Sequence, residues 1–368
     1  MGLLDYYRQF EGMSEEEVNQ GLRAQAAERK RKALTRVETL DLSQTTWLEL
    51  ADPRIVNAIT FVARRGLHHY PHLRGSQLRT ELATRHGVEE ARLILGNGAA
   101  ELLSSATRAL IAPGQRLITS WPSYPLFPIM ARRAHGRAVP VSGGVDALLA
   151  AASEHDDTRV VALASPNDPT GEMLAGAELQ RLLAGLADDV AVLLDESLVE
   201  FSDAQPPDTS LRLLEDHPRL LVFRSFSKAW GLAGLRVGYA LGGPGSEELL
   251  AELAPDLGVS EVSQAGALEA LRSCSEQLAE RVRAVSAERV ALTAALRERG
   301  FEVADSQANF VWVAHPSVDG GELVARLTRA SVLVAGGDAL GEARHVRISV
   351  RDAACSERLL SALDKALL

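Results

Sequence analysis

The chain has 368 residues, of which 46% are hydrophobic and 24% are charged, a composition typical of a globular protein with about two domains. Its formal net charge of −10 disfavours general attraction to nucleic acid or to an anionic membrane. Because the sequence shows no apolar stretch of about 18 residues and no basic start before an apolar core, we expect neither a membrane span nor a signal peptide.

The N-terminal segment from Ser14 to Leu34 is rich in Glu, Arg, Lys, Gln and Ala. Ser14 precedes Glu17 at the spacing of a capping box, which predicts the start of a helix. The helix is polar on most faces, so it could lie on the surface or reach toward a partner subunit. We therefore predict an N-terminal helical arm over residues 1–50.

From about Arg54 to Leu241, short apolar runs alternate with amphipathic helical patterns such as 99–111 and 176–187. The apolar runs cover 92–95, 116–120, 137–141, 159–164, 190–195, 219–224 and 236–241. This alternation predicts a three-layer α/β/α large domain over residues 51–250, with a mostly parallel sheet covered on both faces. Ligands of such sheets bind at the carboxyl ends of the strands.

The remainder of the chain predicts a smaller C-terminal α/β domain over residues 251–368. A long helical region starts near Glu247 and is strongly periodic over 280–300. Short strands are expected near 309–314 and 345–350, with helices from Gly321 and Ser356. The two cysteines form no disulfide framework, which favours a cytoplasmic location.

The strongest chemical signal is the segment SFSKAWGLAGLRVGY at 225–239, which directly follows an apolar strand. A lysine at a strand end, here Lys228, can point into a cleft, where burial and nearby cations lower its pKa and make the amine nucleophilic. Ser225, Ser227 and Arg236 could together hold a phosphate, because hydroxyls and a guanidinium match phosphate oxygens. The alternative, a solvated lysine after a strand, leaves the flanking serines and the glycines unexplained.

A second segment, GNGAAE at 96–101, lies between a strand and an amphipathic helix. Free backbone N–H groups and the helix dipole can bind an anion there. The spacing does not match the dinucleotide pattern GxGxxG, and taken alone a plain tight turn explains the glycines equally well. Together with the serines and Arg236, the segment predicts one phosphate held from two sides.

Three further segments follow strands of the predicted sheet. The loop at 165–171 contains two prolines and a glycine, so it is either a rigid ligand-binding loop or a structural turn. Asp195 ends an apolar strand, where a carboxylate is costly unless it pairs with a cation such as a protonated pyridine nitrogen; a helix cap is the alternative. Tyr124 could stack on a flat ring or simply pack in the core.

Taken in order, the segments GNGAAELL, PSYPLF, SPNDPTG, DESLVEF, SFSKAWGLAGLRVGY, SQANFVWV and VRISV resemble those of fold-type-I pyridoxal-phosphate enzymes. The specific likeness is to the histidinol-phosphate-aminotransferase-like branch of class I/II aminotransferases, and with Tyr70 it extends over residues 70–350. This resemblance implies an enzyme of amino-acid metabolism that transfers an amino group between an amino acid or related amine and a 2-oxo acid. It implies pyridoxal 5'-phosphate as the cofactor and no metal ion.

The resemblance also implies a role for individual residues. Lys228 would hold the cofactor as an imine and then move protons, Asp195 would pair with the pyridine N–H, and Tyr124 would stack on the ring. The remaining contacts to the cofactor, mainly to its phosphate, would come from Gly98, Ala99, Ala100, Ser225, Ser227 and Arg236.

Other implied roles concern the partner subunit and the substrate. Tyr70 would reach the phosphate of the neighbouring site, which implies a homodimer. Arg347 would clamp the substrate carboxylate in a bidentate fork, with Asn309 nearby.

The sequence departs from the family at two positions that would face the phenolic oxygen of the ring. Asp168 stands where the family has Asn, and Leu198 stands where it usually has Tyr. Asn167, one residue early, could substitute if the loop shifts. With two donors to the phenolate lost, we expect the imine to keep its proton to unusually high pH, which a visible-absorbance titration checks. No arginine follows the strand near position 333, which argues against a phosphorylated substrate.

Two other functions remain open from the sequence. A lyase or decarboxylase on the same scaffold is motivated by the changes at Asp168 and Leu198. A half-reaction separates it from an aminotransferase, which converts the cofactor to its amine form, whereas a decarboxylase releases carbon dioxide. A cofactor-binding regulatory or scaffold protein is less favoured, because the residues before Asp41 are too few for a DNA-binding domain.

Overall fold

The computed structural model describes residues 38–47, 49–71 and 76–367, and before residue 38 only positions 14, 16, 20, 23 and 24. The helix predicted over 14–34 therefore lies almost wholly outside the described residues. The chain divides into two compact units, residues 1–40 and 41–368, and the account below concerns the second. Within the described part, no helix is both long and apolar enough to cross a membrane.

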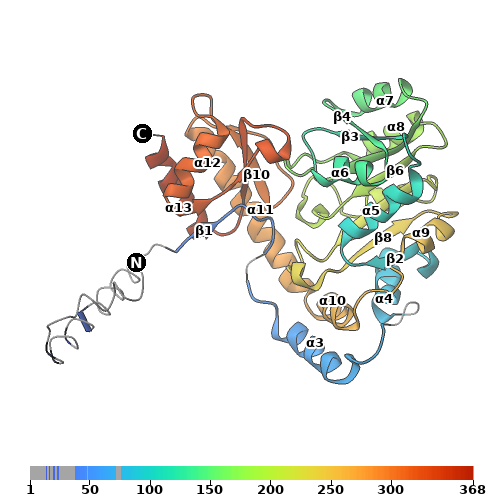
Figure 1. Ribbon diagram of the computed structural model, residues 1–368, viewed down its shortest axis with the longest axis horizontal. Coiled ribbons are helices and arrows are strands. Elements are labelled where there is room, and N and C mark those ends of the chain that lie inside the picture. Colours follow the sequence, from blue (N-terminus) through green and yellow to red (C-terminus); the bar gives the residue numbers. More distant parts are fainter. Residues whose placement is uncertain are drawn as a thin grey trace. The chain divides into compact units, whose positions relative to one another are not determined.

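The centre of the second unit is a seven-stranded sheet, which confirms the predicted α/β class (Figure 1). Its order is β2-β8-β7-β6-β5-β3-β4, and only β8 runs antiparallel to its neighbours. The carboxyl ends of the other six strands therefore lie at one edge. The strands are β2 (Leu93–Gly96), β3 (Arg116–Ser120), β4 (Arg137–Val141), β5 (Thr158–Ala164), β6 (Ala191–Asp195), β7 (Leu220–Ser225) and β8 (Gly238–Gly242).

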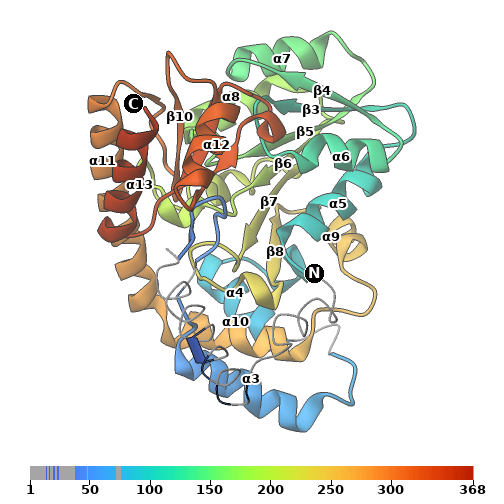
Figure 2. The same ribbon diagram turned by 60° about the vertical axis from the view of Figure 1, so that its left-hand side comes forward.

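Apolar side chains cover both faces of this sheet, as the continuous apolar strands predicted. In β5, Val161 and Leu163 face one hydrophobic cluster, while Val160 and Ala162 face the other. The first cluster is closed by α4 (Gln77–His86), α7 (Val145–Ser153), α8 (Gly176–Gly185) and α10 (Glu261–Ser273). The second is closed by α5 (Ala99–Leu110), α6 (Leu126–Arg133) and α9 (Glu247–Leu253), with α5 and α6 on one side of the sheet in Figure 2.

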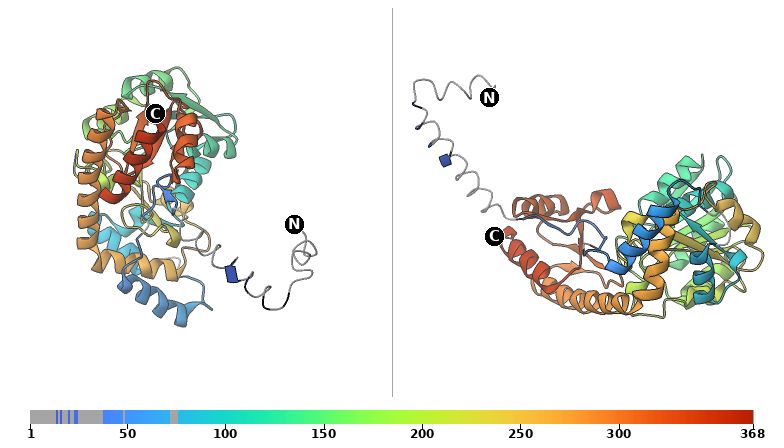
Figure 3. Two further views of the ribbon diagram at one scale, coloured as in Figure 1. Left: turned by 90° about the vertical axis from the view of Figure 1, so that its left-hand side faces the viewer. Right: turned by 90° about the horizontal axis from the view of Figure 1, so that it is seen from below.

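A second, antiparallel sheet of order β12-β13-β10-β9 lies toward the C-terminus, which confirms the expected smaller α/β part. Its strands are β9 (Glu302–Val303), β10 (Phe310–Ala314), β12 (Ala335–Gly336) and β13 (His345–Ser349). The helices packed around it are α11 (Ser275–Glu298), α12 (Gly320–Arg329) and α13 (Ala353–Ala366). The long helix α11 starts beside α10 and runs to this sheet (Figure 3). The predicted domain boundaries at residues 50 and 250 stay predictions.

The chain just after β1 (Leu40–Asp41) adds a further contact to the small sheet region. The amide of Leu42 donates to the carbonyl of Leu333 in β11 (Val332–Leu333) at 2.8 Å, and its carbonyl accepts from Ser349 at 2.9 Å. Residues 43–47 then continue toward the edge of the large sheet, and α3 (Pro53–Gly66) packs against α10. We call residues 43–47 the strap, because they join the two sheets at the site described next.

Candidate active site

Lys228 lies three residues after the end of β7 and is partly buried. Its side chain lines a cavity with Tyr124, Asp168 and Asp195, and its Nζ donates to the hydroxyl of Thr45 in the strap. Burial lowers the pKa of the Lys228 amine, because the ammonium loses its hydration, while the nearby Asp168 carboxylate acts in the opposite direction. The Lys228 side chain is thus partly buried in a cavity rather than fully solvated.

Asp195 is the last residue of β6 and lines the same cavity. One of its carboxylate oxygens accepts from the amide of Ser197 at 2.9 Å. Burial raises the pKa of this carboxyl, because the charged form is poorly solvated at the end of an apolar strand. No α-helix in the described part of the chain is capped by this side chain, which shares its cavity with Lys228.

A buried ion-pair network fixes the ends of β6 and β7 relative to each other. Arg224 in β7 donates through Nε and Nη2 to Glu196 at 3.0 and 2.8 Å, and through Nη1 to Asp208 at 2.7 Å. Arg224 and Glu196 are both almost fully buried. Glu196 follows Asp195, and Arg224 precedes Ser225. The network therefore fixes the position of Asp195 relative to the segment that carries Lys228. Sequence reasoning missed this pair, although two charges at the ends of apolar strands were a usable signal.

The N-terminus of α5 meets the segment after Lys228. Arg236 donates through Nη1 to the hydroxyl of Ser227 and through Nη2 to the carbonyl of Asn97, both at 3.3 Å. The amide of Ser227 donates to the hydroxyl of Ser225 at 3.0 Å. Gly98 has a φ of 91°, and a Cβ there would lie 2.2 Å from Arg236 Nη2. The structure thus brings together the two serines, the arginine and the glycine that the sequence singled out.

The backbone of the first turn of α5 completes this cradle. Ala99 and Ala100 begin the helix, where amides have no partner inside the helix. Gly238 of β8 pairs with both Gly96 and Ser225, and a Cβ at Gly238 would lie 2.4 Å from the amide nitrogen of Ala99. Strand β8 therefore lets the helix end and the serine segment approach closely. Hydroxyls, a guanidinium and free amides are the donors that a phosphate binds.

In the loop at 165–171, the side chains of Asn167 and Asp168 point to different places. Asn167 is buried and its amide accepts from Ser123 at 2.6 Å and donates to the carbonyl of Pro122 and the hydroxyl of Thr170 at 3.0 and 2.9 Å. Its hydrogen bonds are used within the loop, so the geometry gives no support to its replacing the missing family asparagine. Asp168 instead lines the cavity of Lys228.

The two residues predicted to bind substrate contact the strap: Arg347 lies in β13, and Asn309 directly precedes β10. Arg347 in β13 forms an ion pair with Asp168 through Nη1 and donates to the carbonyl of Ser43 through Nη2 at 3.1 Å. Asn309 donates to the carbonyl of Thr45 at 2.9 Å. Sequence reasoning missed Ser43 and Thr45 as site residues, because their contacts here join positions more than 180 residues apart.

The two predicted tyrosines have different surroundings. Tyr124 lines the Lys228 cavity and packs edge-on against Phe127, with ring centroids 5.5 Å apart; burial raises the pKa of its phenol. Tyr70, after α3, is 82% exposed. Its side chain is therefore available to a second subunit rather than packed within its own.

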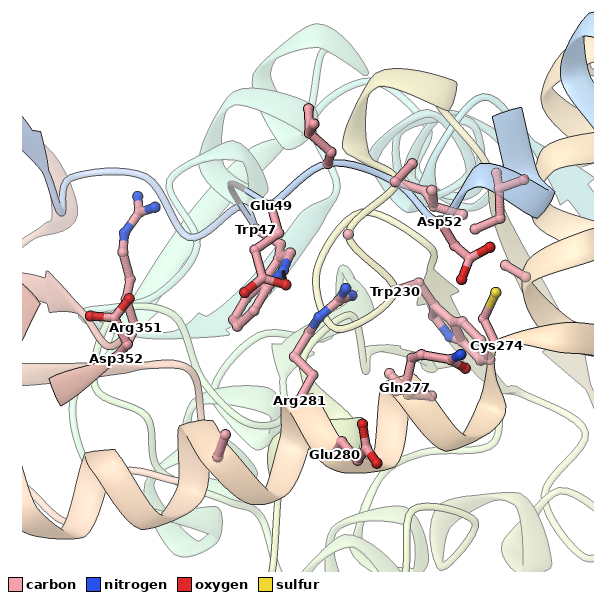
Figure 4. A pocket seen from close by; sticks show the side chains of 18 of the residues that line it. Trp47, Glu49, Asp52, Trp230, Cys274, Gln277, Glu280, Arg281, Arg351 and Asp352 are labelled. Atoms are coloured by element: carbon pink, nitrogen blue, oxygen red, sulfur yellow. Dashed lines mark hydrogen bonds between the residues drawn. The ribbon is translucent and has the colours of Figure 1, made fainter. Parts of the chain in front are cut away.

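A larger cavity of about 540 Å³ lies behind the Lys228 segment (Figure 4). Trp47, Trp230 and Arg281 line it, and the guanidinium of Arg281 lies 4.6 Å from the ring centre of Trp47. Arg281 also donates to the carbonyl of Ala229 at 2.7 Å. Lys228 does not line this cavity, so we assign the chemistry to the smaller one. Within the described ranges, no cluster of His, Cys, Asp and Glu could hold a metal ion.

Fold and site together define an α/β protein with a partly buried lysine near the carboxyl edge of its main sheet. A sequence profile described as "Aminotransferase class I and II" matches residues 38–365. The chain belongs to this family of aminotransferases. Its substrates are accordingly an amino acid and a 2-oxo acid.

Individual relatives are similar over most of their length. The aromatic amino acid aminotransferase of Cutibacterium acnes is 35% identical over 266 residues, which cover 71% of this chain and 75% of that protein. Histidinol-phosphate aminotransferase 2 of Ralstonia nicotianae is 37% identical over 310 residues, covering 82% and 83%. The crystal structure of histidinol-phosphate aminotransferase from Sinorhizobium meliloti in complex with pyridoxal-5'-phosphate matches with a TM-score of 0.80 and 26% identity, covering 93% and 94%.

Proposed function

We propose that this aminotransferase works with pyridoxal phosphate bound covalently to Lys228. The observation that carries the proposal is the single cavity that Lys228 shares with Asp195 and Tyr124. A buried carboxylate, an aromatic ring and a desolvated amine are three groups that one pyridinium aldehyde would satisfy together. The relative from Sinorhizobium meliloti was crystallised with this cofactor, which supports the proposal.

The residues around Arg236 fit the phosphate of this cofactor. A Cβ at Gly98 would fill the space beside the guanidinium, so the glycine keeps the helix end open to an anion. Ser225, Ser227 and the first amides of α5 supply further donors. We propose Gly98, Ala99, Ala100, Ser225, Ser227 and Arg236 as the phosphate site.

When bound, the cofactor supplies an electron sink for the bond broken at the amine-bearing carbon of the substrate. The chain's own groups do the rest. Lys228 Nζ, whose pKa burial lowers, would take a proton from that carbon and deliver it to the cofactor carbon that receives the amino group. Asp195 would hold a proton on the pyridine nitrogen, and Tyr124 would fix the plane of the ring. Arg347 would be the cation for the substrate carboxylate.

We further propose a homodimer in which Tyr70 reaches the neighbouring phosphate site. The support is its 82% exposure together with the exposure of Val56, Phe61 and Leu67 in and just after α3. Such a surface is typical of an interface. A cytoplasmic location is supported by Cys274 and Cys355, both of which are free thiols.

The amino donor that we propose carries no phosphate. In β11 and just after it, Val332, Leu333 and Val334 offer apolar side chains and no cation. Relatives are named for aromatic amino acids as well as for histidinol phosphate, so the names of the relatives are compatible with either donor. A comparison of initial rates with phosphorylated and unphosphorylated forms of one amine checks this, and a preference for the phosphorylated form contradicts it.

The proposed function is tested by trapping the cofactor. Borohydride reduction of the loaded protein should leave a pyridoxyl mass on the peptide that contains Lys228. Lys228→Ala should lose this mass and at least about 10³-fold in kcat, because it removes both the attachment point and the proton carrier. Lys365→Ala is the matched control and should behave as wild type. An unmodified Lys228 peptide would remove the basis of the proposal.

A half-reaction then separates the chemistries. One equivalent of amino acid should convert the bound cofactor to its amine form, and one equivalent of 2-oxo acid should restore it. Release of carbon dioxide with the aldehyde form retained would instead point to a decarboxylase on this scaffold.

A further inference from the structure

The guanidinium of Arg347 already has an anionic partner inside the protein. Asp168 lines the Lys228 cavity and pairs with Arg347 Nη1, and the Ser43 carbonyl takes Nη2 at 3.1 Å. The Arg347 and Asp168 side chains are only 12% and 15% exposed. In such a poorly hydrated place a charged hydrogen bond is strong and little screened by salt.

This pair lies where a substrate carboxylate is needed. Among the described residues, the guanidiniums of Arg236 and Arg347 both help to lower the pKa of the Lys228 amine. Arg236 belongs to the anion cradle at the end of α5, since it bonds Ser227 and the Asn97 carbonyl. Of these two arginines, Arg347 is therefore the one available to the carboxylate of an amino acid. Its guanidinium is paired with Asp168.

A carboxylate entering this site meets an unfavourable field. It must either displace Asp168 from Nη1 or bind beside it, and two carboxylates at one guanidinium repel each other. A neutral hydroxymethyl or carboxamide group meets no such repulsion and can donate a hydrogen bond to Asp168. Asp168 cannot turn away without leaving a carboxylate without a partner in a mostly buried place.

We propose that Asp168 is a specificity-determining residue that competes with the substrate carboxylate for Arg347. The site thereby disfavours amino acids relative to amines of the same side chain that carry a hydroxymethyl or carboxamide group instead of the carboxylate. This inference rests on the proposed function, because it takes the Lys228 cavity as the place where the amine reacts.

The test compares one amino acid, the best substrate in a panel, with its amino alcohol and amino amide. Asp168→Asn keeps an oxygen that can accept from Arg347 Nη1 but removes the charge. It should raise the kcat/KM ratio of acid to alcohol by at least about tenfold, mainly through a lower KM for the acid. Asp168→Ala, which also removes the charge, should shift the ratio in the same direction.

The matched control is Asp305→Asn, which neutralises another Asp–Arg pair, with Arg297 at 2.7 Å, that does not line the Lys228 cavity. It should leave the ratio unchanged. An unchanged ratio in both Asp168 variants, or a raised KM for the acid in Asp168→Asn, would mean that Asp168 merely positions Arg347, and would overturn the inference.

A direct measurement keeps this inference separate from the proposed function. The ligand is the carboxylic acid that has the side chain of the best amino-acid substrate but lacks its amino group. Calorimetry on the purified protein measures its dissociation constant. Asp168→Asn should bind it at least about tenfold more tightly than wild type. Equal binding, or no binding by either protein, overturns the inference whether or not turnover is seen. A missing pyridoxyl mass at Lys228 overturns the proposed function alone.

Discussion

At the scale of single residues, the environment of Lys228 combines two opposing effects. Burial disfavours its ammonium form, whereas Asp168 and Asp195 favour it, and burial is the larger effect. The pKa is therefore lowered, and the neutral, nucleophilic amine is present from a lower pH upward than for a solvated lysine. In a more hydrated cavity, the pKa of Lys228 would be lowered less.

We expect this shift to be visible in the rate at which cofactor-free protein takes up pyridoxal phosphate. The rate should rise with pH and level off below the ordinary lysine pKa of 10.5, because the neutral amine is then already fully populated. Visible absorbance follows the reaction, and N-acetyl-lysine amide is the reference. A rate that keeps rising up to the lysine value would show that the amine is not perturbed.

Leu198 is a second residue whose environment bears on the cofactor. It is buried and lines the Lys228 cavity, while Asp168 pairs with Arg347. Neither side chain offers a hydrogen-bond donor to a phenolate. The high-pH retention of the imine proton, expected from the sequence, stays a prediction that the absorbance titration of the loaded protein decides.

At the scale of elements, the anion cradle depends on how closely α5 approaches Arg236. Gly98 ends the turn before α5 with a φ of 91°, in a region that residues with a Cβ rarely adopt. A methyl group there would also push the guanidinium away from the helix end, since the contact would be 2.2 Å.

Gly98→Ala should therefore weaken the binding of pyridoxal phosphate by at least about tenfold, measured as a dissociation constant by absorbance or fluorescence. Gly114→Ala is the matched control, because Gly114 has a similar φ of 87° but no atom within 4 Å of the added Cβ. Both variants should lose about 1–2 kcal/mol of stability from backbone strain. Equal cofactor affinity in the two variants would place the phosphate elsewhere.

The strap is the other element on which the site depends. Thr45 contacts Lys228, and Trp47 lies under the guanidinium of Arg281, which itself holds the Ala229 carbonyl. A cation over an aromatic ring and a hydrogen bond to the residue after Lys228 link the strap to the reactive segment. The loop that carries the lysine is thus fixed from both sides, by the strap and by α11.

At the scale of the whole molecule, the proposed homodimer predicts complementation between damaged subunits. Tyr70→Ala removes a phosphate contact from the partner's site, whereas Lys228→Ala inactivates its own site. In a mixed dimer one site carries both defects and the other carries none. Random pairing makes half of the dimers mixed, so co-expression should give about a quarter of wild-type activity.

The measurement is the activity of the co-expressed pair at limiting cofactor, compared with each variant alone. Activity equal to the mean of the two separate variants would show that Tyr70 acts within its own subunit or not at all. Size-exclusion chromatography with light scattering reports the oligomeric state independently.

The sequence by itself determined the layered α/β architecture and the segments that carry the chemistry. Apolar runs such as 159–164 must be buried on both faces, and this local requirement fixes strands between helices. Lys228, Asp195 and Gly98 all stand at ends of such runs, so the rule that parallel strands end at one edge was enough to bring them together.

Only the tertiary structure decided which side chains meet in the cavity. Asp168 and Arg347 are 179 residues apart in sequence, and Thr45 and Lys228 are 183 apart. Local sequence sets backbone conformation, but the partner of a polar side chain depends on how distant elements pack. For this reason no single segment of the sequence predicts that Asn167 bonds to Ser123 near its own loop. Nor does any one segment predict that Arg347 pairs with Asp168.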